Sequence, residues 1–248
     1  MATAMDFDWL VISLERTPDR LEQFRAINAH LGPLIGTLPA VDGQQLDRGE
    51  LVRAGLLVEG TEWSAGALGV SLSHRLCWLR AIESGRPVCV FEDDVVLRHD
   101  FLEQALGTID ALPLDWDVVL FGYNTDSVLD VEILPGCNVR GTFSPGTPTL
   151  DDCERFALTS GSVVAMRLHN AFGSCSYAVS PAGAQRLMEG CFPLRRPRAY
   201  VPTLKFVVTL ESPDTLMNEL YRDIGAYVCV PPIVMPINDK QVSTVWKT

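Results

Sequence analysis

The stretch VCVFEDDVVL, residues 88–97, turns from apolar to acidic and back to apolar within one short segment. Residues 88–91 form an apolar run typical of a buried strand, and Glu92, Asp93 and Asp94 follow directly. Carboxylates at the end of a buried strand repel one another and lose hydration, so they need positive charge nearby. Alternation along an extended strand would place Glu92 and Asp94 on one side and Asp93 on the other. An acid-x-acid pair can bind Mg2+ or Mn2+; the alternative is a strand end whose acids face water or cap a helix.

The segments around this stretch alternate between strand patterns and helix patterns. Short apolar runs predict strands at 9–14, 34–41, 88–91, 115–123 and 176–180. Apolar residues at helical spacing, with caps and proline or glycine at their ends, predict helices at 18–31, 68–82, 101–112, 181–190 and 214–225. This alternation predicts an α/β fold with a mostly parallel central sheet and helices on both faces. Residues 124–170 have weak periodicity and predict functional loops or short hairpins.

Composition limits the classes of protein to which the chain can belong. It has 248 residues, of which 47% are hydrophobic and 21% are charged, so it can bury a full core in one domain, 1–248. The net charge of -11 argues against a nucleic-acid partner, which requires a basic face. No segment reaches the roughly 18–20 apolar residues of a membrane helix, and the N-terminus lacks a signal-peptide pattern. Seven cysteines without CxxC spacing predict reduced thiols and a cytoplasmic location.

Six ordered blocks resemble glycosyltransferase family 25, which includes lipooligosaccharide and collagen galactosyltransferases. The resemblance extends from residue 9 to about residue 190, with weaker agreement to the end. The blocks are VISLERTPDR (11–20), AVDG (40–43), AGALGVSLSH (65–74), VCVFEDDVVL (88–97), GSCSYAVSPAGAQRLM (173–188) and QVST (241–244). Their common order is far more specific than any single block.

The resemblance implies a single Rossmann-like domain of the GT-A type, with residues 9–123 binding the nucleotide sugar and 124–248 on the acceptor side. It implies a metal-dependent, inverting transfer of a hexose, with galactose expected, from a UDP-sugar to a saccharide acceptor such as lipooligosaccharide. Mn2+, or Mg2+, is the implied cofactor. Two alternatives stay open: transfer to a protein or small-molecule hydroxyl, and a non-catalytic member that binds sugar nucleotides.

The chain departs from the family pattern at two places. Ser13 stands where the family has Asn in the first strand. Before the Ser-His pair the family has Glu-x-Gly-Cys, and this chain has Ala67, Leu68, Gly69 and Val70. The departure at Ala67 and Val70 puts donor preference and activity in question, while the three acids remain.

The acids and the first helix supply the predicted metal and donor residues. Asp94 is the predicted metal ligand, and Glu92 or Asp93 reaches the ribose or an outer-shell water. Arg16 and Arg20 follow the first strand, where their donors can reach phosphate or base oxygens. The alternative for Arg20 is an exposed helix residue that pairs with Asp19 or Glu22, with little effect on stability.

Four further residues complete the predicted donor site. Ser13 occupies the family's Asn position, and Asp42 can accept a hydrogen bond from uracil or ribose, although an Asp before Gly also simply forms a turn. Ser73 and His74 lie on a helix, where His74 is either a donor-site residue or a satisfied structural histidine. A nucleophilic role for Ser73 is disfavoured because no relay is visible.

The inverting transfer needs a base for the acceptor hydroxyl, and Asp214 is the predicted one. The alternatives for Asp214 are a second metal ligand and a helix N-terminal acid stabilised by the dipole, with Glu211 and Glu219 as rival bases. Tyr177 and Ser180 border the late strand and either shape the acceptor pocket or pack in the core. The RRPR run at 195–198 suggests no more than peripheral contact with a membrane.

Overall fold

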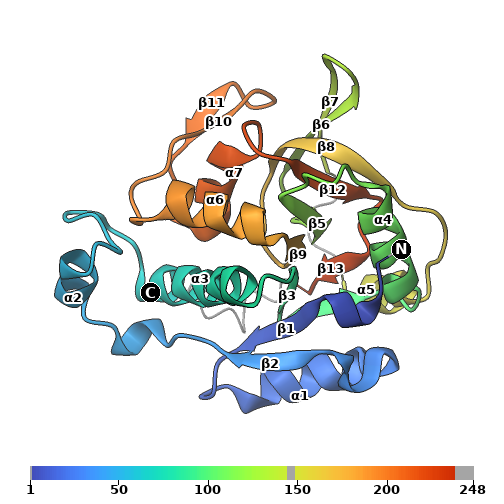
Figure 1. Ribbon diagram of the computed structural model, residues 1–248, viewed down its shortest axis with the longest axis horizontal. Helices are drawn as coiled ribbons and strands as arrows, with labels where there is room; N and C mark the ends of the chain where they lie inside the picture. The colour runs from blue at the N-terminus through green and yellow to red at the C-terminus, as the bar shows by residue number, and fades with distance from the viewer. Residues whose placement is uncertain (1, 144–148, 238–248) are drawn as a thin grey trace.

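The computed structural model describes residues 2–143 and 149–237, and within them one nine-stranded sheet dominates (Figure 1). Its strand order is β2-β1-β3-β9-β5-β12-β8-β6-β7. The strands are β1 (Asp8–Ser13), β2 (Gly36–Pro39), β3 (Val88–Glu92), β5 (Val118–Gly122), β6 (Val128–Leu134), β7 (Cys137–Thr142), β8 (Val164–Ala171), β9 (Ser176–Val179) and β12 (Ala226–Val230). Two small sheets join β4 (Val95–Leu97) to β13 (Val234–Pro236) and β10 (Ala199–Val201) to β11 (Phe206–Val208).

The predicted α/β class is confirmed, with a sheet of mixed pairing. Strands β2, β1, β3, β5, β12 and β6 run in one direction, whereas β9, β8 and β7 run in the other. Strand β9 lies between β3 and β5 and is antiparallel to both, with Val179 opposite Val88 and Val118. A late segment of the chain therefore completes the centre of a sheet begun by early segments.

Helices cover both faces of the sheet, as predicted. They are α1 (Pro18–Ile27), α2 (Arg48–Arg53), α3 (Ala65–Ser84), α4 (Phe101–Ala111), α5 (Leu150–Ala157), α6 (Pro181–Cys191) and α7 (Pro213–Leu220). Strand alternation divides the core: Val88 and Val90 pack with α3, α6 and α7, while Cys89 and Phe91 pack with α1 and α4. Glu92 follows Val90 on the side of α3, and this position brings it to His74.

Helix α3 approaches the loop after β2 closely because both contribute glycine. A Cβ on Gly69 would lie 2.6 Å from the carbonyl oxygen of Val41 and 2.8 Å from the nitrogen of Gly43. The Ser73 hydroxyl, one turn further on, accepts a hydrogen bond from the Val41 N–H at 2.9 Å. The helix begins after Ser64, whose hydroxyl accepts from the Ala67 N–H, and ends at Gly85 with φ 66°. The AVDG and AGALGVSLSH blocks thus form one packed unit.

The structure differs most from the sequence-based expectation in the second half. The segment 124–170 contains the predicted hairpin, as β6 and β7, but also α5 and the long strand β8. The segment between α6 and α7 forms the β10–β11 hairpin, which weak periodicity did not reveal. Strands β10 and β11 pair only with each other, and the first half of β8 is not fully buried. Their sequences therefore lack the continuous apolar runs that identify buried strands.

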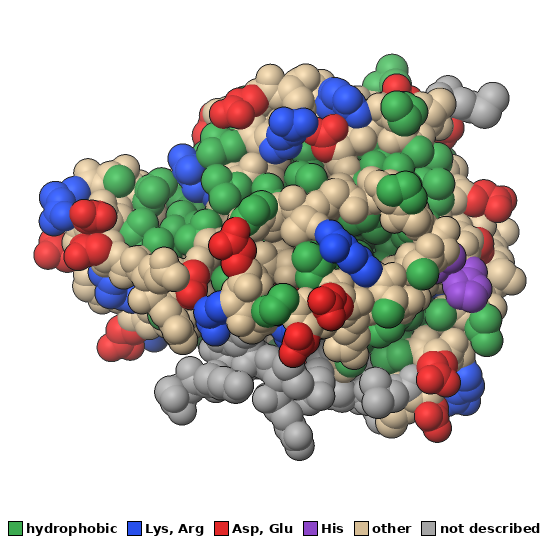
Figure 2. All heavy atoms as spheres, turned by 90° about the horizontal axis from the view of Figure 1, so that it is seen from below, with side chains coloured by type: hydrophobic (Ala, Val, Ile, Leu, Met, Phe, Trp, Pro, Cys, Tyr) green, Lys and Arg blue, Asp and Glu red, His purple; other side chains and the backbone are tan. Residues whose placement is uncertain are grey.

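The described helices include none that is both long and apolar enough to cross a membrane. Figure 2 shows acidic and basic side chains interspersed on the face in view, with hydrophobic ones between them. All seven cysteines are free, and only Cys137 is exposed.

Candidate functional site

Strand β3 ends at Glu92, and Asp93 and Asp94 form the turn that leads into β4. Strand alternation therefore does not extend through the three acids, and the simple two-sided arrangement expected from an extended strand is absent at Asp93 and Asp94. Instead each carboxylate has its own set of partners. Asp93 is buried, while the side chains of Glu92 and Asp94 are 33% and 34% exposed.

Arg20 on α1 supplies the positive charge that the acids require. Its Nε donates to Asp93 Oδ1 at 2.8 Å, and its Nη2 lies 3.0 Å from Asp94 Oδ2. Burial opposes the charged form of Arg20, but the hydrogen bonds and charges of Asp93 and Asp94 outweigh it and raise its pKa. The Ser13 hydroxyl, at the end of β1, donates to the other oxygen of Asp93 at 2.8 Å. Arg20 is therefore not the exposed helix residue of the alternative prediction, and its side chain is only 16% exposed.

Glu92 belongs to a second network that leads into α3. The Ser174 hydroxyl donates to Glu92 Oε1 at 3.1 Å, and Nε2 of His74 lies 3.6 Å from the same oxygen. On the other side of the ring, His74 Nδ1 is 2.9 Å from the Tyr177 hydroxyl, which accepts from Trp78 Nε1 at 2.8 Å. Because Trp78 only donates, the Tyr177 proton is free to point at Nδ1, and this favours a proton on Nε2 facing Glu92.

The pKa values of Glu92 and Asp94 are shifted in opposite directions. Burial opposes ionisation of Glu92, but the adjacent His74 ring, with the Ser174 hydrogen bond, lowers the pKa of Glu92. Burial and the charge of Glu92 raise the pKa of Asp94 to about 6, against the opposing charge of Arg20. Asp94 is thus the acid whose charge is least compensated by the protein.

A divalent cation fits this arrangement only with help from a ligand. Within residues 2–143 and 149–237, no group of three or more His, Cys, Asp and Glu side chains is arranged to hold a metal ion alone. Asp93 has Ser13 and Arg20 as partners, and Glu92 has Ser174 and His74. Asp94 shares Arg20 with Asp93 and is the more accessible of these two carboxylates, so it is the candidate ligand. Mg2+ commonly takes one or two protein carboxylates together with phosphate oxygens and water. The donor set therefore suits a cation that arrives with a diphosphate.

Arg16, Asp42 and Ser73 form an adjoining group. Arg16 Nε lies 3.1 Å from Asp42 Oδ2, and Asp42 also accepts from the Gln44 N–H at 3.1 Å. Asp42 thus has the predicted turn role, as the cap of the short 3-10 helix η3 (Gly43–Gln45). The Ser73 hydroxyl is buried and donates to the Gly69 carbonyl at 2.7 Å, so it holds the loop after β2 onto α3.

Asp214 opens α7 and ties that helix to the acid site. It accepts from the Gly173 N–H at 2.8 Å and from the Thr215 N–H at 2.9 Å. The next residue after Gly173 is Ser174, the partner of Glu92, so two hydrogen bonds connect Asp214 to the acids. The rival bases are engaged elsewhere: Glu219 pairs with Arg195 at 2.5 Å, and Glu211 accepts from the Glu62 N–H at 3.2 Å.

Sequence reasoning missed Ser174 and Trp78 as members of the site. Ser174 lies inside the GSCSYAVS block, and its place before β9 was the available signal. Trp78 lies one turn beyond His74 on α3, a spacing that does indicate a shared helix face. Tyr177 is buried in the core and still contacts His74, while Ser180 caps α6 by accepting from the Gly183 N–H. The QVST block lies outside the described residues.

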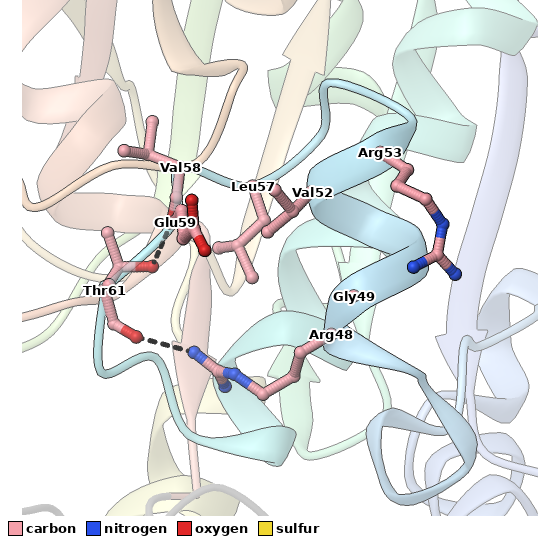
Figure 3. A pocket seen from close by; sticks show the side chains of 9 residues that line it. Arg48, Gly49, Val52, Arg53, Leu57, Val58, Glu59 and Thr61 are labelled. Atoms are coloured by element: carbon pink, nitrogen blue, oxygen red, sulfur yellow. Dashed lines mark hydrogen bonds between the residues drawn. The ribbon is translucent and has the colours of Figure 1, made fainter.

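A separate cavity of about 410 Å3 lies between α2 and the loop that follows it (Figure 3). Its lining includes Arg48, Arg53, Leu57 and Glu59, and it shares no residue with the acid site. Arg48 donates to the carbonyl oxygens of Thr61 and Trp63, so this cation braces the loop. The acids at the end of β3 show the stronger convergence of charged and polar groups, and they mark the candidate site.

Comparison with known proteins shows the family of the chain. The profile of glycosyltransferase family 25, described as an LPS biosynthesis protein family, matches residues 7–201, so the chain belongs to this family. It is 27% identical to human "Inactive glycosyltransferase 25 family member 3" over an alignment of 266 residues, covering 95% of this chain and 39% of that protein. A Drosophila pseudoobscura pseudoobscura protein, "Glycosyltransferase 25 family member", is 26% identical over 45% of this chain and 20% of its own length.

This chain therefore spans about two-fifths of the length of its human relative. Among solved structures, mannose-1-phosphate geranyltransferase from Thermus thermophilus is a distant likeness. It has a TM-score of 0.40 and 15% identity, covering 94% of this chain and 74% of that one.

Proposed function

We propose that this protein binds a UDP-hexose with Mn2+ or Mg2+ beside β1 and β3, and transfers the hexose, with inversion, to a saccharide acceptor such as lipooligosaccharide. Galactose is the expected hexose. The observation that carries the proposal is Asp94, the least compensated of the three carboxylates, next to a fixed Arg20, in a chain of glycosyltransferase family 25. Free cysteines favour a reducing compartment, and we propose a cytoplasmic location.

Each residue of the site has a role in this proposal. Asp94 would hold the cation, which supplies charge to the diphosphate leaving group. Ser13 and Arg20 fix Asp93, and this network orients the turn that presents Asp94. The His74 network keeps Glu92 ionised and placed to accept a donor hydroxyl such as that of a ribose. Arg16 and Asp42 line the adjoining loop, where a base or ribose would reach them.

The test of donor binding is a thermal-shift titration with UDP, with and without Mn2+. We expect UDP to stabilise the protein only when Mn2+ is present, by about 2.7 kcal/mol at one hundred times its dissociation constant. Asp94→Asn should remove the Mn2+ dependence because an amide carries no charge. Full Mn2+-dependent UDP affinity in this variant would exclude Asp94 as the ligand.

Asp214 is the proposed base, and its present hydrogen bonds define the test. A base acts in the transition state, so Asp214→Asn should lower kcat about 10²–10⁴-fold and change UDP affinity only slightly. A second metal ligand predicts that UDP affinity and rate fall together. A structural role at Gly173 and Thr215 predicts a lower melting temperature with normal turnover per folded molecule. Single-turnover transfer, UDP affinity and melting temperature, measured on one preparation, separate these outcomes.

A second candidate is a non-catalytic protein that binds a sugar nucleotide. The name of the human relative and the residues Ala67 and Val70 favour it. Ala67 is buried in the first turn of α3, between Ala65 and Gly69, whose backbone atoms approach Gly43, the residue after Asp42. The family's Glu at this position would place a charged side chain in the same packed region. UDP binding without donor hydrolysis or transfer to any saccharide, protein or small-molecule hydroxyl would support this second candidate.

A further inference from the structure

The segment between α6 and α7 has an unusual charge for this molecule. Residues 192–210 contain three arginines and one lysine and no Asp or Glu, in a chain whose net charge is -11. Arg195 pairs with Glu219, whereas Arg196, Arg198 and Lys205 are exposed and form no ion pair with any residue that the structure describes. The segment is therefore a local cationic surface on an acidic protein.

The same segment exposes large apolar side chains. Strands β10 and β11 form a hairpin in which Tyr200 lies opposite Val207. Ala199 and Val201 are buried, so alternation turns Tyr200 outward, where it is 55% exposed. The exposed apolar residues of the hairpin are Tyr200, Leu204, Phe206, Val207 and Leu210. Tyr200 and Val207 share one face of the hairpin because they lie opposite each other, and neighbouring exposed apolar residues of this kind are typical of interaction surfaces.

The turn of the hairpin places a lysine where glycine would be less strained. Lys205 has φ 55°, a left-handed conformation that glycine adopts without steric conflict. Its side chain is exposed between Leu204 and Phe206, which are 42% and 50% exposed. The tip of the hairpin thus combines one cation with two large apolar side chains.

The base of the hairpin is held to the body of the protein. Asn170 on β8 donates to the Tyr200 carbonyl at 3.4 Å, and Glu219 on α7 accepts from the Arg198 N–H and pairs with Arg195. Figure 1 shows the hairpin projecting from the edge of the molecule beside α6 and α7. Helix α7, which carries Glu219, begins at Pro213, directly before Asp214. The hairpin and the candidate base Asp214 are therefore attached to the same helix.

We propose that the β10–β11 hairpin docks this protein on an anionic lipid bilayer. Cations near such a surface each add attraction, and Tyr, Phe and Leu side chains insert at the interface beneath them. An acidic protein is repelled by anionic lipid over most of its surface. The acid-free segment 192–210, with its exposed apolar residues, would therefore be the part of the protein that faces the bilayer. This proposal goes beyond sugar transfer, and its test uses no nucleotide, so its failure and that of donor binding are separate results.

The experiment is co-sedimentation of the whole chain with vesicles. We expect binding to vesicles of phosphatidylcholine mixed with phosphatidylglycerol, weak binding to pure phosphatidylcholine, and loss of binding at high salt. Phe206→Ser with Lys205→Glu should weaken binding to the mixed vesicles by about tenfold or more. Leu114→Ser with Arg53→Glu, an exposed leucine and an exposed arginine elsewhere, should bind as the unmodified protein does.

Lys205→Gly provides a variant that separates docking from folding. Because glycine accepts φ 55°, this variant should melt at the same or a higher temperature, yet bind mixed vesicles about fivefold more weakly. No binding to either vesicle, equal binding to both, or unchanged binding in Lys205→Gly would overturn the proposal. Sedimentation equilibrium showing a dimer that Phe206→Ser dissociates would overturn it too, in favour of a second copy as the occupant.

Discussion

Arg16 and Arg20 lie four residues apart, but their carboxylate partners differ in burial. Asp93, the partner of Arg20, is 8% exposed, whereas the pair of Arg16 and Asp42 has side-chain exposures of 40% and 16%. Arg20→Ala would leave Asp93 buried without its cation, and we expect a loss of about 3 kcal/mol in the free energy of unfolding. The matched variant Arg16→Ala should lose less than about 1 kcal/mol. Urea unfolding of both measures the difference, and equal losses would contradict the assignment of Arg20 as the counter-ion.

Asp94 should reduce the stability of the metal-free protein at neutral pH. Its pKa is about 6 in the folded protein and near 3.8 when unfolded, so the folded state binds more protons between these values. Stability due to this group therefore falls as pH rises from about 4 to 6. Allowing for the 34% exposure of the side chain, Asp94→Asn should be about 1 kcal/mol more stable at pH 7 in EDTA.

The difference should become small near pH 3.5, where the carboxyl is mostly protonated in both the folded and the unfolded state. Urea unfolding at the two pH values tests this. A variant that is less stable at pH 7 would show that Asp94 is already compensated by the protein.

The sequence predicted that the acids at residues 92–94 need a positive charge nearby, but it did not predict which residue supplies that charge. Three adjacent acids after a buried strand required a cation, yet Arg20 lies far away along the chain, and local spacing alone favoured an exposed helix residue at this position. The Tyr177 contact with His74 likewise joins β9 to α3. Such partners depend on strand order, which periodicity within each segment does not contain.

At the scale of elements, the contact between α3 and the loop after β2 depends on Gly69. Gly69→Ala would place a methyl group against the Val41 carbonyl and the Gly43 nitrogen, both backbone atoms, so we expect a loss of about 1–3 kcal/mol. Gly107 in α4 is the matched control, because its added Cβ would meet nothing within 4 Å. Gly107→Ala should stabilise the protein by about 0.5–1 kcal/mol through helix propensity. Thermal unfolding of both variants checks the sign, and a neutral Gly69→Ala would disprove the close packing.

The elements that sequence predicted well are the ones with buried apolar faces. Strand β3 and helices α3 and α6 follow the expected positions within a few residues. Strand β8 and the β10–β11 hairpin were missed because they carry charged, polar and apolar residues in no simple period. Their positions follow from neighbours, β12 and β6 for β8, and α7 for the hairpin.

At the scale of the whole molecule, the reactivity of the cysteine thiols tests the packing of the core. Six of the seven thiols are buried, and Cys137 on β7 is exposed. Burial raises the pKa of Cys77 and Cys229 to about 12, which suppresses the reactive thiolate. Ellman's reagent should therefore label one thiol rapidly in the native protein and all seven after unfolding. Cys137→Ser should remove the rapid reaction, and rapid labelling of further thiols would contradict the described packing.

The insertion of β9 between β3 and β5 has a consequence for biosynthesis. When Gly122 leaves the ribosome, β3 and β5 exist, but the strand that joins them is still to be made at residues 176–179. At ordinary translation rates this interval is on the order of 3–10 s. During it, the nascent chain carries three unpaired apolar strand edges, one on β3 and both of β5, because β12 also comes later. Such edges are prone to wrong pairing with other chains. The central sheet can close only after translation has passed Val179, so the first half of the chain depends on the second for its folding.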